Sequence, residues 1–315
     1  MINVKLGHSG LTVSKICFGS LTVGPLQASL SIDEGSGIIA YAINRGINFI
    51  DTAELYNTYE YIREGIKKSG YKETVISSKT YAYTKDMARK AVEDARTRLD
   101  RDYIDIFMLH EQESIYTLEG HKEALDFLFE CKAKGIIRAV GASMHHIAAV
   151  YGAIEAKLDV IHPIINTAGL GIVGGSREEM LEALKKAKAK GIGIFSMKAF
   201  GGGNLFLKAE ECLSFVFGEP SIDAVAIGMQ SISEVDANIG FAETGSFSSQ
   251  SKRTIGFKQR YLHIEDYCTG CGCCVKRCPN NALNIKDKTA VCDKKKCLLC
   301  GYCSAICPMF AIRVL

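Results

Sequence analysis

The chain has 315 residues, of which 47% are hydrophobic and 23% charged, as is ordinary for a globular protein. Its formal net charge of +3 is too small to indicate binding to nucleic acid or to a membrane surface. No stretch approaches roughly 18 uncharged apolar residues, and residues 1–10 contain no apolar core of a signal peptide, so we expect a cytoplasmic protein without membrane association.

Short apolar segments alternate with longer amphipathic segments over most of the chain. Strands are expected at 16–18, 47–50, 75–77, 104–109, 137–140, 160–161, 192–195 and 224–227. Helices are expected at 37–45, 60–68, 86–99, 122–134, 146–156, 178–190, 210–217 and 234–241. Eight such units predict a (β/α)8 TIM barrel of the α/β class, with a hairpin of segments 4–6 and 11–13 closing its bottom. A doubly wound open sheet is the alternative, although no G-x-G-x-x-G pattern follows the first strand.

Four polar residues stand at or beside the ends of neighbouring predicted strands. Asp51 ends the second strand, Lys79 the third and His110 the fourth, and Tyr56 lies about one turn beyond Asp51. The chemistry of a (β/α)8 barrel occurs where its strands end and its loops begin. Each residue alone has an ordinary explanation, such as a helix cap for Asp51 or a solvated loop cation for Lys79. Together they predict a reaction site at the top of the barrel.

The sequence around these residues resembles the aldo-keto reductase family over roughly residues 3–240. D-T-A-E-L-Y at 51–56, I-S-S-K at 76–79 and D-Y-I-D at 102–105, which leads to His110, look like the family's D-T-A-x-x-Y, I-S-T-K and D-Y-I-D-L-x-x-x-H. G-A-S at 141–143 is similar to its G-V-S. The resemblance implies an oxidoreductase that reduces a small-molecule carbonyl, or oxidises an alcohol, with hydride from NAD(P)H.

The resemblance implies catalytic roles for Asp51, Tyr56, Lys79 and His110. Tyr56 would act as general acid/base and donate a proton to the nascent alkoxide, although a free phenol has a pKa near about 10. Lys79, held by Asp51, would lower that pKa towards working pH. His110 would orient the carbonyl and share in polarising it.

A nicotinamide site is also implied by the resemblance, at Ser143, Asn166, Met197, Lys198, Gly201, Gly202 and Asn238. Met144 stands where the family usually has an asparagine that holds the nicotinamide amide. Residues 228–235 carry one anion and no cation, whereas Arg and Lys are expected at the 2′-phosphate of NADP. NADH is therefore at least as good a candidate as NADPH, and FMN in place of nicotinamide is an alternative consistent with the altered contacts.

Cysteine is concentrated at the end of the chain, where ten of the 13 cysteines lie between Cys268 and Cys307. Two C-x2-C-x2-C-x3-C-P runs occur there, at 268–279 and 297–308. This spacing is that of bacterial ferredoxins, in which the fourth cysteine of each run binds the other cluster. It predicts two [4Fe-4S] clusters, one bound by Cys268, Cys271, Cys274 and Cys307, and the other by Cys297, Cys300, Cys303 and Cys278.

A zinc site is the alternative for these cysteines, but such sites usually have two C-x2-C pairs without a third cysteine or a following proline. Cys273 and Cys292 lie off the pattern and are not predicted to be ligands. The segment resembles the two-[4Fe-4S] ferredoxin family over nearly its whole length.

The predicted organisation is therefore a barrel at 1–242, a Ser- and Gly-rich linker at 243–260 and a small C-terminal ferredoxin-like iron-sulfur domain at 261–315. We expect the domain to pack near the barrel mouth and its clusters to relay electrons to the active site. A protein redox partner is a further candidate, because Lys294–Lys296 could steer an acidic protein. The alternative function is an electron-transfer ferredoxin protein whose barrel binds a flavin or acts as a docking scaffold.

Overall fold

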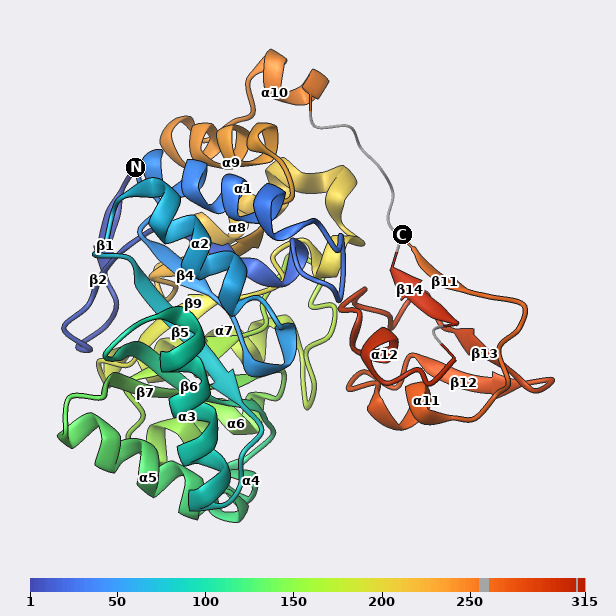
Figure 1. The fold of residues 1–315 in the computed structure, drawn as a ribbon, viewed down its shortest axis with the longest axis horizontal. Helices are drawn as coiled ribbons and strands as arrows, with labels where there is room; N and C mark the ends of the chain where they lie inside the picture. The colour runs from blue at the N-terminus through green and yellow to red at the C-terminus, as the bar shows by residue number, and fades with distance from the viewer. Residues whose placement is uncertain (255–260, 310, 315) are drawn as a thin grey trace.

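Eight parallel strands form a closed barrel in the computed structural model, which describes residues 1–254, 261–309 and 311–314. Around the barrel the strand order is β10-β3-β4-β5-β6-β7-β8-β9 (Figure 1). The strands are β3 (Ile16–Gly19), β4 (Phe49–Asp51), β5 (Val75–Thr80), β6 (Ile104–Gln112), β7 (Ile137–Met144), β8 (Val160–Pro163), β9 (Gly193–Ser196) and β10 (Ala224–Gly228). The predicted TIM barrel is confirmed.

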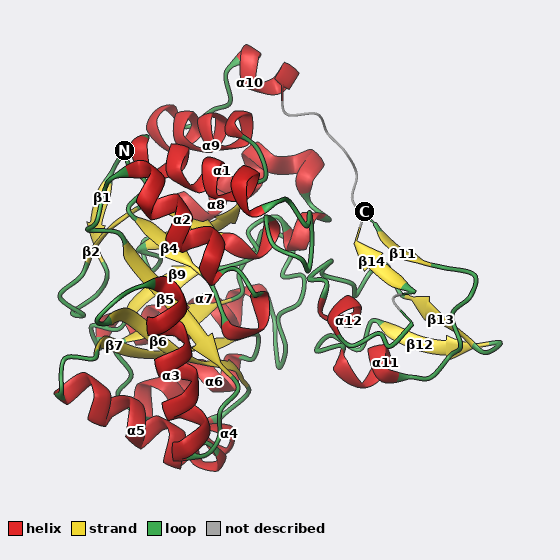
Figure 2. Cartoon of the chain, in the orientation of Figure 1, coloured by secondary structure: helices red, strands yellow, loops and turns green. Residues whose placement is uncertain are grey.

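A ring of helices covers the outside of the barrel (Figure 2). The helices are α1 (Ile32–Asn44), α2 (Tyr59–Ser69), α3 (Lys85–Leu99), α4 (Ile115–Gly120), α5 (Lys122–Ala133), α6 (Ile147–Glu155), α7 (Arg177–Ala189), α8 (Ala209–Gly218) and α9 (Ile232–Thr244). Helix α1 starts five residues before its predicted position because Ser31 and Glu34 form a capping box at its N-terminus. Among the described residues, no helix is long and apolar enough to cross a membrane.

The N-terminal hairpin closes the bottom of the barrel, as predicted. Its strands β1 (Asn3–Lys5) and β2 (Thr12–Ser14) pair antiparallel, and Leu6, Leu11 and Val13 pack among the inward-facing side chains of the barrel strands. Gly7 has a positive φ of 50°, and a Cβ there would lie 2.3 Å from the backbone nitrogen of Gly193. The hairpin therefore seals the end opposite to the strand ends that carry the site.

The C-terminal segment forms a separate small module beside the barrel (Figure 1). Strand β11 (Leu262–Ile264) pairs with β14 (Ile312–Val314), and β12 (Leu283–Lys286) pairs with β13 (Thr289–Cys292), both antiparallel. A short helix follows the start of each cysteine run, α11 (Cys273–Arg277) in the first and α12 (Tyr302–Ala305) in the second. This repeated arrangement agrees with the duplicated sequence pattern.

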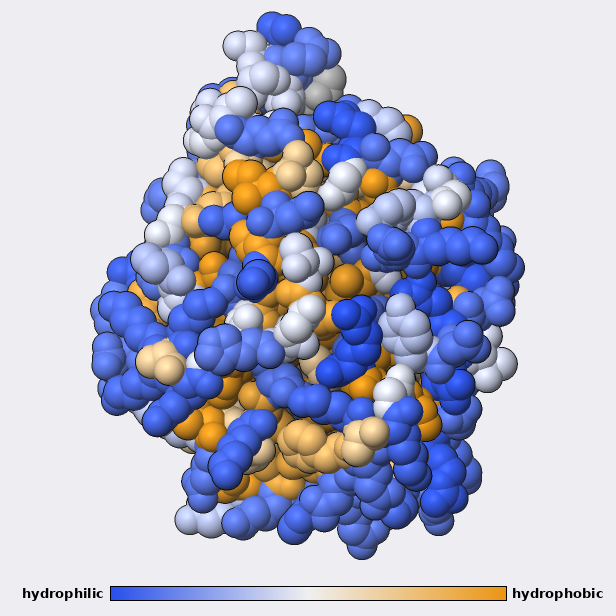
Figure 3. Space-filling view, turned by 90° about the vertical axis from the view of Figure 1, so that its left-hand side faces the viewer, coloured by the Kyte–Doolittle hydropathy of each residue, from blue (hydrophilic) through white to orange (hydrophobic). Residues whose placement is uncertain are grey.

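The connection between barrel and module is only partly the linker that its composition predicts. Helix α9 ends at Thr244, and a further short helix, α10 (Ser249–Thr254), follows. Phe247 packs on Phe241 of α9 with their ring centroids 5.0 Å apart, which ties this segment to the barrel. The rest of the predicted linker, 255–260, lies outside the described residues. Figure 3 shows the face of the barrel turned away from the module, where hydrophilic residues surround smaller hydrophobic areas.

Candidate active site

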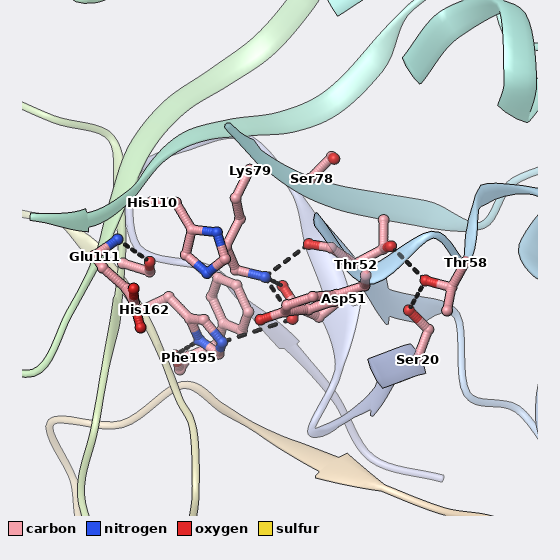
Figure 4. A network of polar contacts seen from close by, with 12 residues as sticks. Ser20, Asp51, Thr52, Thr58, Ser78, Lys79, His110, Glu111, His162 and Phe195 are labelled. Atoms are coloured by element: carbon pink, nitrogen blue, oxygen red, sulfur yellow. Dashed lines mark hydrogen bonds and ion pairs between the residues drawn. The ribbon is translucent and has the colours of Figure 1, made fainter. Parts of the chain in front are cut away.

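The tops of three adjacent strands bring the four predicted catalytic residues together. Asp51 ends β4, Lys79 lies near the end of β5 and His110 lies in β6, while Tyr56 ends the short 3₁₀ helix η2 (Glu54–Tyr56) directly after β4 (Figure 4 draws the surrounding network). All four side chains are buried. Because parallel neighbouring strands end at the same edge, residues far apart in the chain become neighbours.

Lys79 and Asp51 form a buried ion pair at the centre of the site. The Nζ of Lys79 lies 2.7 Å from each carboxylate oxygen of Asp51 and 2.7 Å from the carbonyl oxygen of Thr52. Burial lowers the pKa of Lys79, and the charge of Asp51 opposes that change. All three ammonium protons therefore have acceptors within the site, as a buried charge requires.

The loop that carries Tyr56 is anchored by a chain of buried hydroxyl groups. The Oγ1 of Thr58 lies 2.7 Å from that of Thr52 and 2.7 Å from the Oγ of Ser20 (Figure 4). These contacts fix both ends of the short segment between β4 and α2. They hold Tyr56 against the mouth of the barrel.

Tyr56 does not show the lowered pKa that the family resemblance implied. Burial, and then the negative charge of Asp51, raise the pKa of Tyr56 well above its ordinary value. The Nζ of Lys79 lies 5.0 Å from the centroid of the Tyr56 ring, and its protons are directed to Asp51 and Thr52. The expectation fails because burial is the largest influence on the pKa of Tyr56, and the charge of Asp51 acts in the same direction.

His110 is held as a neutral imidazole. Burial lowers its pKa well below the ordinary value, and the cations of Lys79, Lys198 and Arg277 act in the same direction. Its ring stacks on Tyr81 at a centroid distance of 4.5 Å. Its Nδ1 has no hydrogen-bond partner within the described parts of the chain.

His162 is a site residue that the sequence did not single out. Its Nε2 lies 3.7 Å from a carboxylate oxygen of Asp51, and its Nδ1 lies 2.7 Å from the carbonyl oxygen of Phe195 (Figure 4). Burial lowers the pKa of His162 to about 4, so the ring is neutral beside the carboxylate. Its position in β8, next to the strand end, was the only available signal.

A large cleft opens beside the four residues and encloses about 1610 Å³ outside the atoms, counting its opening to solvent. Asp51 and Tyr56 lie in its wall, as do four of the seven predicted nicotinamide contacts, namely Met197, Lys198, Gly202 and Asn238. Polar residues, namely Lys198, Gln230, Glu234 and Asn238, line the cleft together with apolar residues such as Phe200 and Phe206. A mixed lining of this kind suits a dinucleotide, which has both aromatic and polar parts.

The other three predicted contacts lie outside this lining. Both ends of the Asn166 amide bond the backbone of Leu170, at 2.9 Å each. The Oγ of Ser143 accepts a hydrogen bond of 2.9 Å from the backbone of Glu111. Gly201 is buried and does not line the cleft, although the next two residues, Gly202 and Gly203, do. Asn166 therefore serves its own loop, and its role in cofactor binding remains a prediction, as do those of Ser143 and Gly201.

Segment 243–254 also contributes to the cleft, although its composition reads as a linker. Phe247 and Lys252 lie in the cleft wall, and Lys252 forms an ion pair with Glu210 at 3.2 Å. The apolar Phe247 within a Ser-rich stretch was the one sign in the sequence that this segment packs against the barrel. The structure thus adds the cation of Lys252 to the cleft wall, whereas residues 228–235 supply none.

The C-terminal module reaches into the barrel mouth, so the predicted packing there is confirmed. Leu298 is buried in the main core of the barrel, and Cys300 lies in the wall of the cleft. The amide of Asn204 donates a hydrogen bond of 2.7 Å to the carbonyl oxygen of Cys297. Tyr302 packs against Tyr56 beside the site.

The arrangement of the cysteines fits iron-sulfur clusters by its donor chemistry. Cys307 lies with Cys268, Cys271 and Cys274 around one small cavity, which Cys273 also lines. Cys278 packs beside Cys297, and Cys292 packs there too. Backbone amides donate to the sulfurs of Cys268, Cys278 and Cys307 at 3.5, 3.3 and 3.2 Å. Such bonds stabilise thiolate ligands and set cluster potentials.

Comparison with known proteins gives two family matches. The model of the aldo/keto reductase family matches residues 15–211, and that of the 4Fe-4S binding domain matches residues 261–284. The L-galactose dehydrogenase of Arabidopsis thaliana is 22% identical over 287 residues, covering 74% of this chain and 86% of that protein. The 6-dehydroglucose reductase of Novosphingobium aromaticivorans is 25% identical, covering 64% and 69% of the two chains.

Among solved structures, the holo form of the aldo-keto reductase AKR11C1 from Bacillus halodurans is similar to this chain. The TM-score is 0.65 at 20% identity, and the similarity covers 80% of this chain and 94% of that one. At this identity the likeness establishes the shared fold.

Proposed function

Because the chain belongs to the aldo/keto reductase family, we propose that its barrel reduces a small-molecule carbonyl, or oxidises the corresponding alcohol, with Tyr56 as general acid/base. The chain is an oxidoreductase of this family that carries a 4Fe-4S binding domain. One observation carries the proposal: Asp51, Tyr56, Lys79 and His110 are buried together at the barrel top beside an open cleft.

Tyr56 is suited to donate a proton. Its raised pKa keeps the phenol protonated, so the donor form is available across the neutral range. A carbonyl that accepts hydride develops negative charge on its oxygen and needs a proton there. We expect the reductive rate to hold from about pH 6 to about pH 9, because neither Tyr56 nor His110 titrates there.

His110 and the Lys79–Asp51 pair would support this step without exchanging a proton themselves. The neutral imidazole of His110 can donate from Nε2 to the carbonyl oxygen, which orients the substrate and polarises the bond. The Lys79 cation lies 5.0 Å from the centre of the Tyr56 ring and fixes the ring against the buried ion pair. Asp51 keeps the lysine in place through two bonds of 2.7 Å.

Met197, Lys198, Gly202 and Asn238 would hold a nicotinamide dinucleotide in the cleft. When bound, this cofactor supplies the hydride. We propose NADH as the preferred form because the carboxylate of Glu234 lies in the cleft wall, where it would oppose a 2′-phosphate. The cation of Lys252 is already paired with Glu210.

We further propose that the module holds two [4Fe-4S] clusters that exchange electrons with the occupant of the cleft. The position of Cys300 in the cleft wall supports this, because it brings a predicted ligand of the second cluster to the active site. A cluster moves one electron at a time and a nicotinamide moves two, so a flavin would be the natural intermediary. FMN therefore stays the alternative occupant.

The test uses purified protein under anaerobic conditions. NADH and then NADPH are added to the oxidised protein, and the absorbance of clusters and of any flavin is followed, with 4-nitrobenzaldehyde as the test carbonyl. We expect aldehyde reduction, a lower KM for NADH than for NADPH, and bleaching of the clusters. Reduction without bleaching would remove the electron relay and leave a conventional reductase barrel.

Tyr56→Phe tests the catalytic assignment in the same assay. The loss of a general acid is expected to lower kcat by about 100-fold or more. Tyr83→Phe is the matched control, because it removes the same hydroxyl group from a tyrosine that is 55% exposed. Equal activity of the two variants would contradict the proposed function.

A further inference from the structure

Tyr302 lies at the catalytic site although it belongs to the iron-sulfur module. Its hydroxyl oxygen is 3.4 Å from that of Tyr56 and 3.4 Å from the Nε2 of His110. These are the two groups that the proposed function assigns to the substrate oxygen. The side chain is only 3% exposed, so it is a fixed part of the site rather than a surface residue.

The three polar groups are incompletely satisfied by one another. Hydrogen bonds between hydroxyl groups are usually about 2.7–2.8 Å long, so contacts of 3.4 Å are weak. A buried hydroxyl normally has a better partner than this. One oxygen atom placed among Tyr56, His110 and Tyr302 could accept from all three, and catalytic hydrogen bonds often shorten only when substrate binds.

Arg277 holds the Tyr302 ring from within the same module. Its guanidinium lies 4.8 Å from the centroid of the Tyr302 ring and 5.2 Å from that of Tyr81. It also donates a 3.1 Å hydrogen bond to the hydroxyl of Tyr81 and lies 3.9 Å from a carboxylate oxygen of Glu111. The module thus supplies a phenol whose ring is held in place by a cation.

We propose that Tyr302 is a further catalytic residue: with substrate bound, its hydroxyl donates a hydrogen bond to the same carbonyl oxygen that Tyr56 protonates. This inference rests on the proposed function and adds a donor that no barrel residue supplies. Tyr302 keeps its proton, and the proton that forms the alcohol comes from Tyr56. The contribution is greatest in the transition state, where the oxygen carries most negative charge.

The position of Tyr302 depends on the second cysteine run. Tyr302 lies between Cys300 and Cys303, and Arg277 directly precedes Cys278. All three cysteines are predicted ligands of one cluster under the crossed pattern. The barrel site is therefore complete only when this part of the module is folded against it.

Tyr302→Phe is the variant that tests the inference, since it keeps the ring and its contact with Arg277 and removes only the hydroxyl. In the 4-nitrobenzaldehyde assay we expect kcat to fall at least about tenfold with a smaller change in KM, because the lost donor acts mainly in the transition state. Tyr267→Phe is the matched control: Tyr267 lies in the same module and is 56% exposed, so its kcat should equal that of the wild type. Iron content and cluster absorbance should be unchanged in both variants.

Two outcomes would overturn the inference. An unchanged kcat would mean that Tyr302 only packs against the site, and a raised kcat would mean that it blocks the oxygen position. If Tyr302→Phe loses iron, a protein with 3-fluorotyrosine at position 302 is tested in its place. This residue keeps the ring and its packing but makes the hydroxyl a stronger hydrogen-bond donor. A kcat equal to that of the wild type would then overturn the inference.

Tyr56→Phe separates the two proposals. Full activity in that variant defeats the proposed function, whereas an inactive Tyr56→Phe beside a fully active Tyr302→Phe defeats this inference alone.

Discussion

Lys79 and Asp51 illustrate how single residues in this site depend on one another. Both side chains are almost fully buried, and each satisfies the charge of the other. A buried charge without its partner is costly, whereas an exposed pair contributes little. Tyr56 keeps its proton chiefly because it is buried, and the negative charge of Asp51 raises its pKa further.

Replacing Lys79 should therefore destabilise the protein as well as inactivate it. In Lys79→Met the Asp51 carboxylate stays buried without a cation, and we expect the free energy of unfolding to fall by about 3–5 kcal/mol. Urea denaturation followed by circular dichroism measures this change. Lys85→Met is the matched control because Lys85 pairs with Glu130 on the surface, and its denaturation midpoint should hardly move. Equal shifts in the two variants would show that the buried pair is not a stabilising unit.

At the scale of elements, the loop from Gly201 to Gly203 joins the barrel to the module. Gly202 has a φ of 73°, and a Cβ there would lie 1.7 Å from the carbonyl oxygen of Leu298. On the other side of the contact, a Cβ at Gly301 would lie 2.1 Å from the carbonyl oxygen of Leu26. The two backbones approach each other so closely that only glycine fits.

Gly202→Ala should loosen the module from the barrel. The added methyl group cannot be accommodated beside the backbone of Leu298, so we expect faster hydrogen–deuterium exchange in residues 297–303. Gly174→Ala is the control, because Gly174 has a φ of 84° but nothing within 4 Å of its would-be Cβ. It carries the same backbone strain without the clash. Similar exchange in both variants would mean that strain, and not contact with the module, causes the effect.

At the scale of the whole molecule, the module has an inner and an outer part with respect to the barrel. Cys300 lies in the cleft wall, whereas Cys271 is exposed. The two residues are predicted ligands of different clusters. Loss of the cluster that Cys300 is predicted to bind should therefore disturb the active site, because Tyr302 lies within the same cysteine run.

Cys300→Ala and Cys271→Ala compare the two parts directly. We expect both variants to lose iron, as measured per chain, but only Cys300→Ala to lower kcat for 4-nitrobenzaldehyde with NADH as the donor. The physical reason is that the inner run positions the phenol of Tyr302 next to Tyr56 and His110. An equal loss of kcat in the two variants would indicate that the module acts only as a single folded unit.

Much of the barrel could be predicted because its information is local. Buried parallel strands appear as short apolar runs, and the strand-top positions of Asp51, Lys79 and His110 follow from where those runs end. The cysteine spacing likewise predicted an iron-sulfur domain, since closely spaced thiolates bind one cluster. Helix starts were less accurate, as α1 shows, because a capping box extends the helix beyond its amphipathic part.

Other features were decided by tertiary structure alone. Tyr302 and Tyr56 are 246 positions apart, and no local pattern marks a tyrosine between two cysteines as an active-site residue. Lys252 reaches the cleft from a segment whose composition predicts a linker. The direction of the Tyr56 pKa also depends on burial and on the negative charge of Asp51. The sequence by itself determined the elements and the local motifs, while contacts between distant segments decided how the module completes the site, because such contacts depend on packing in three dimensions.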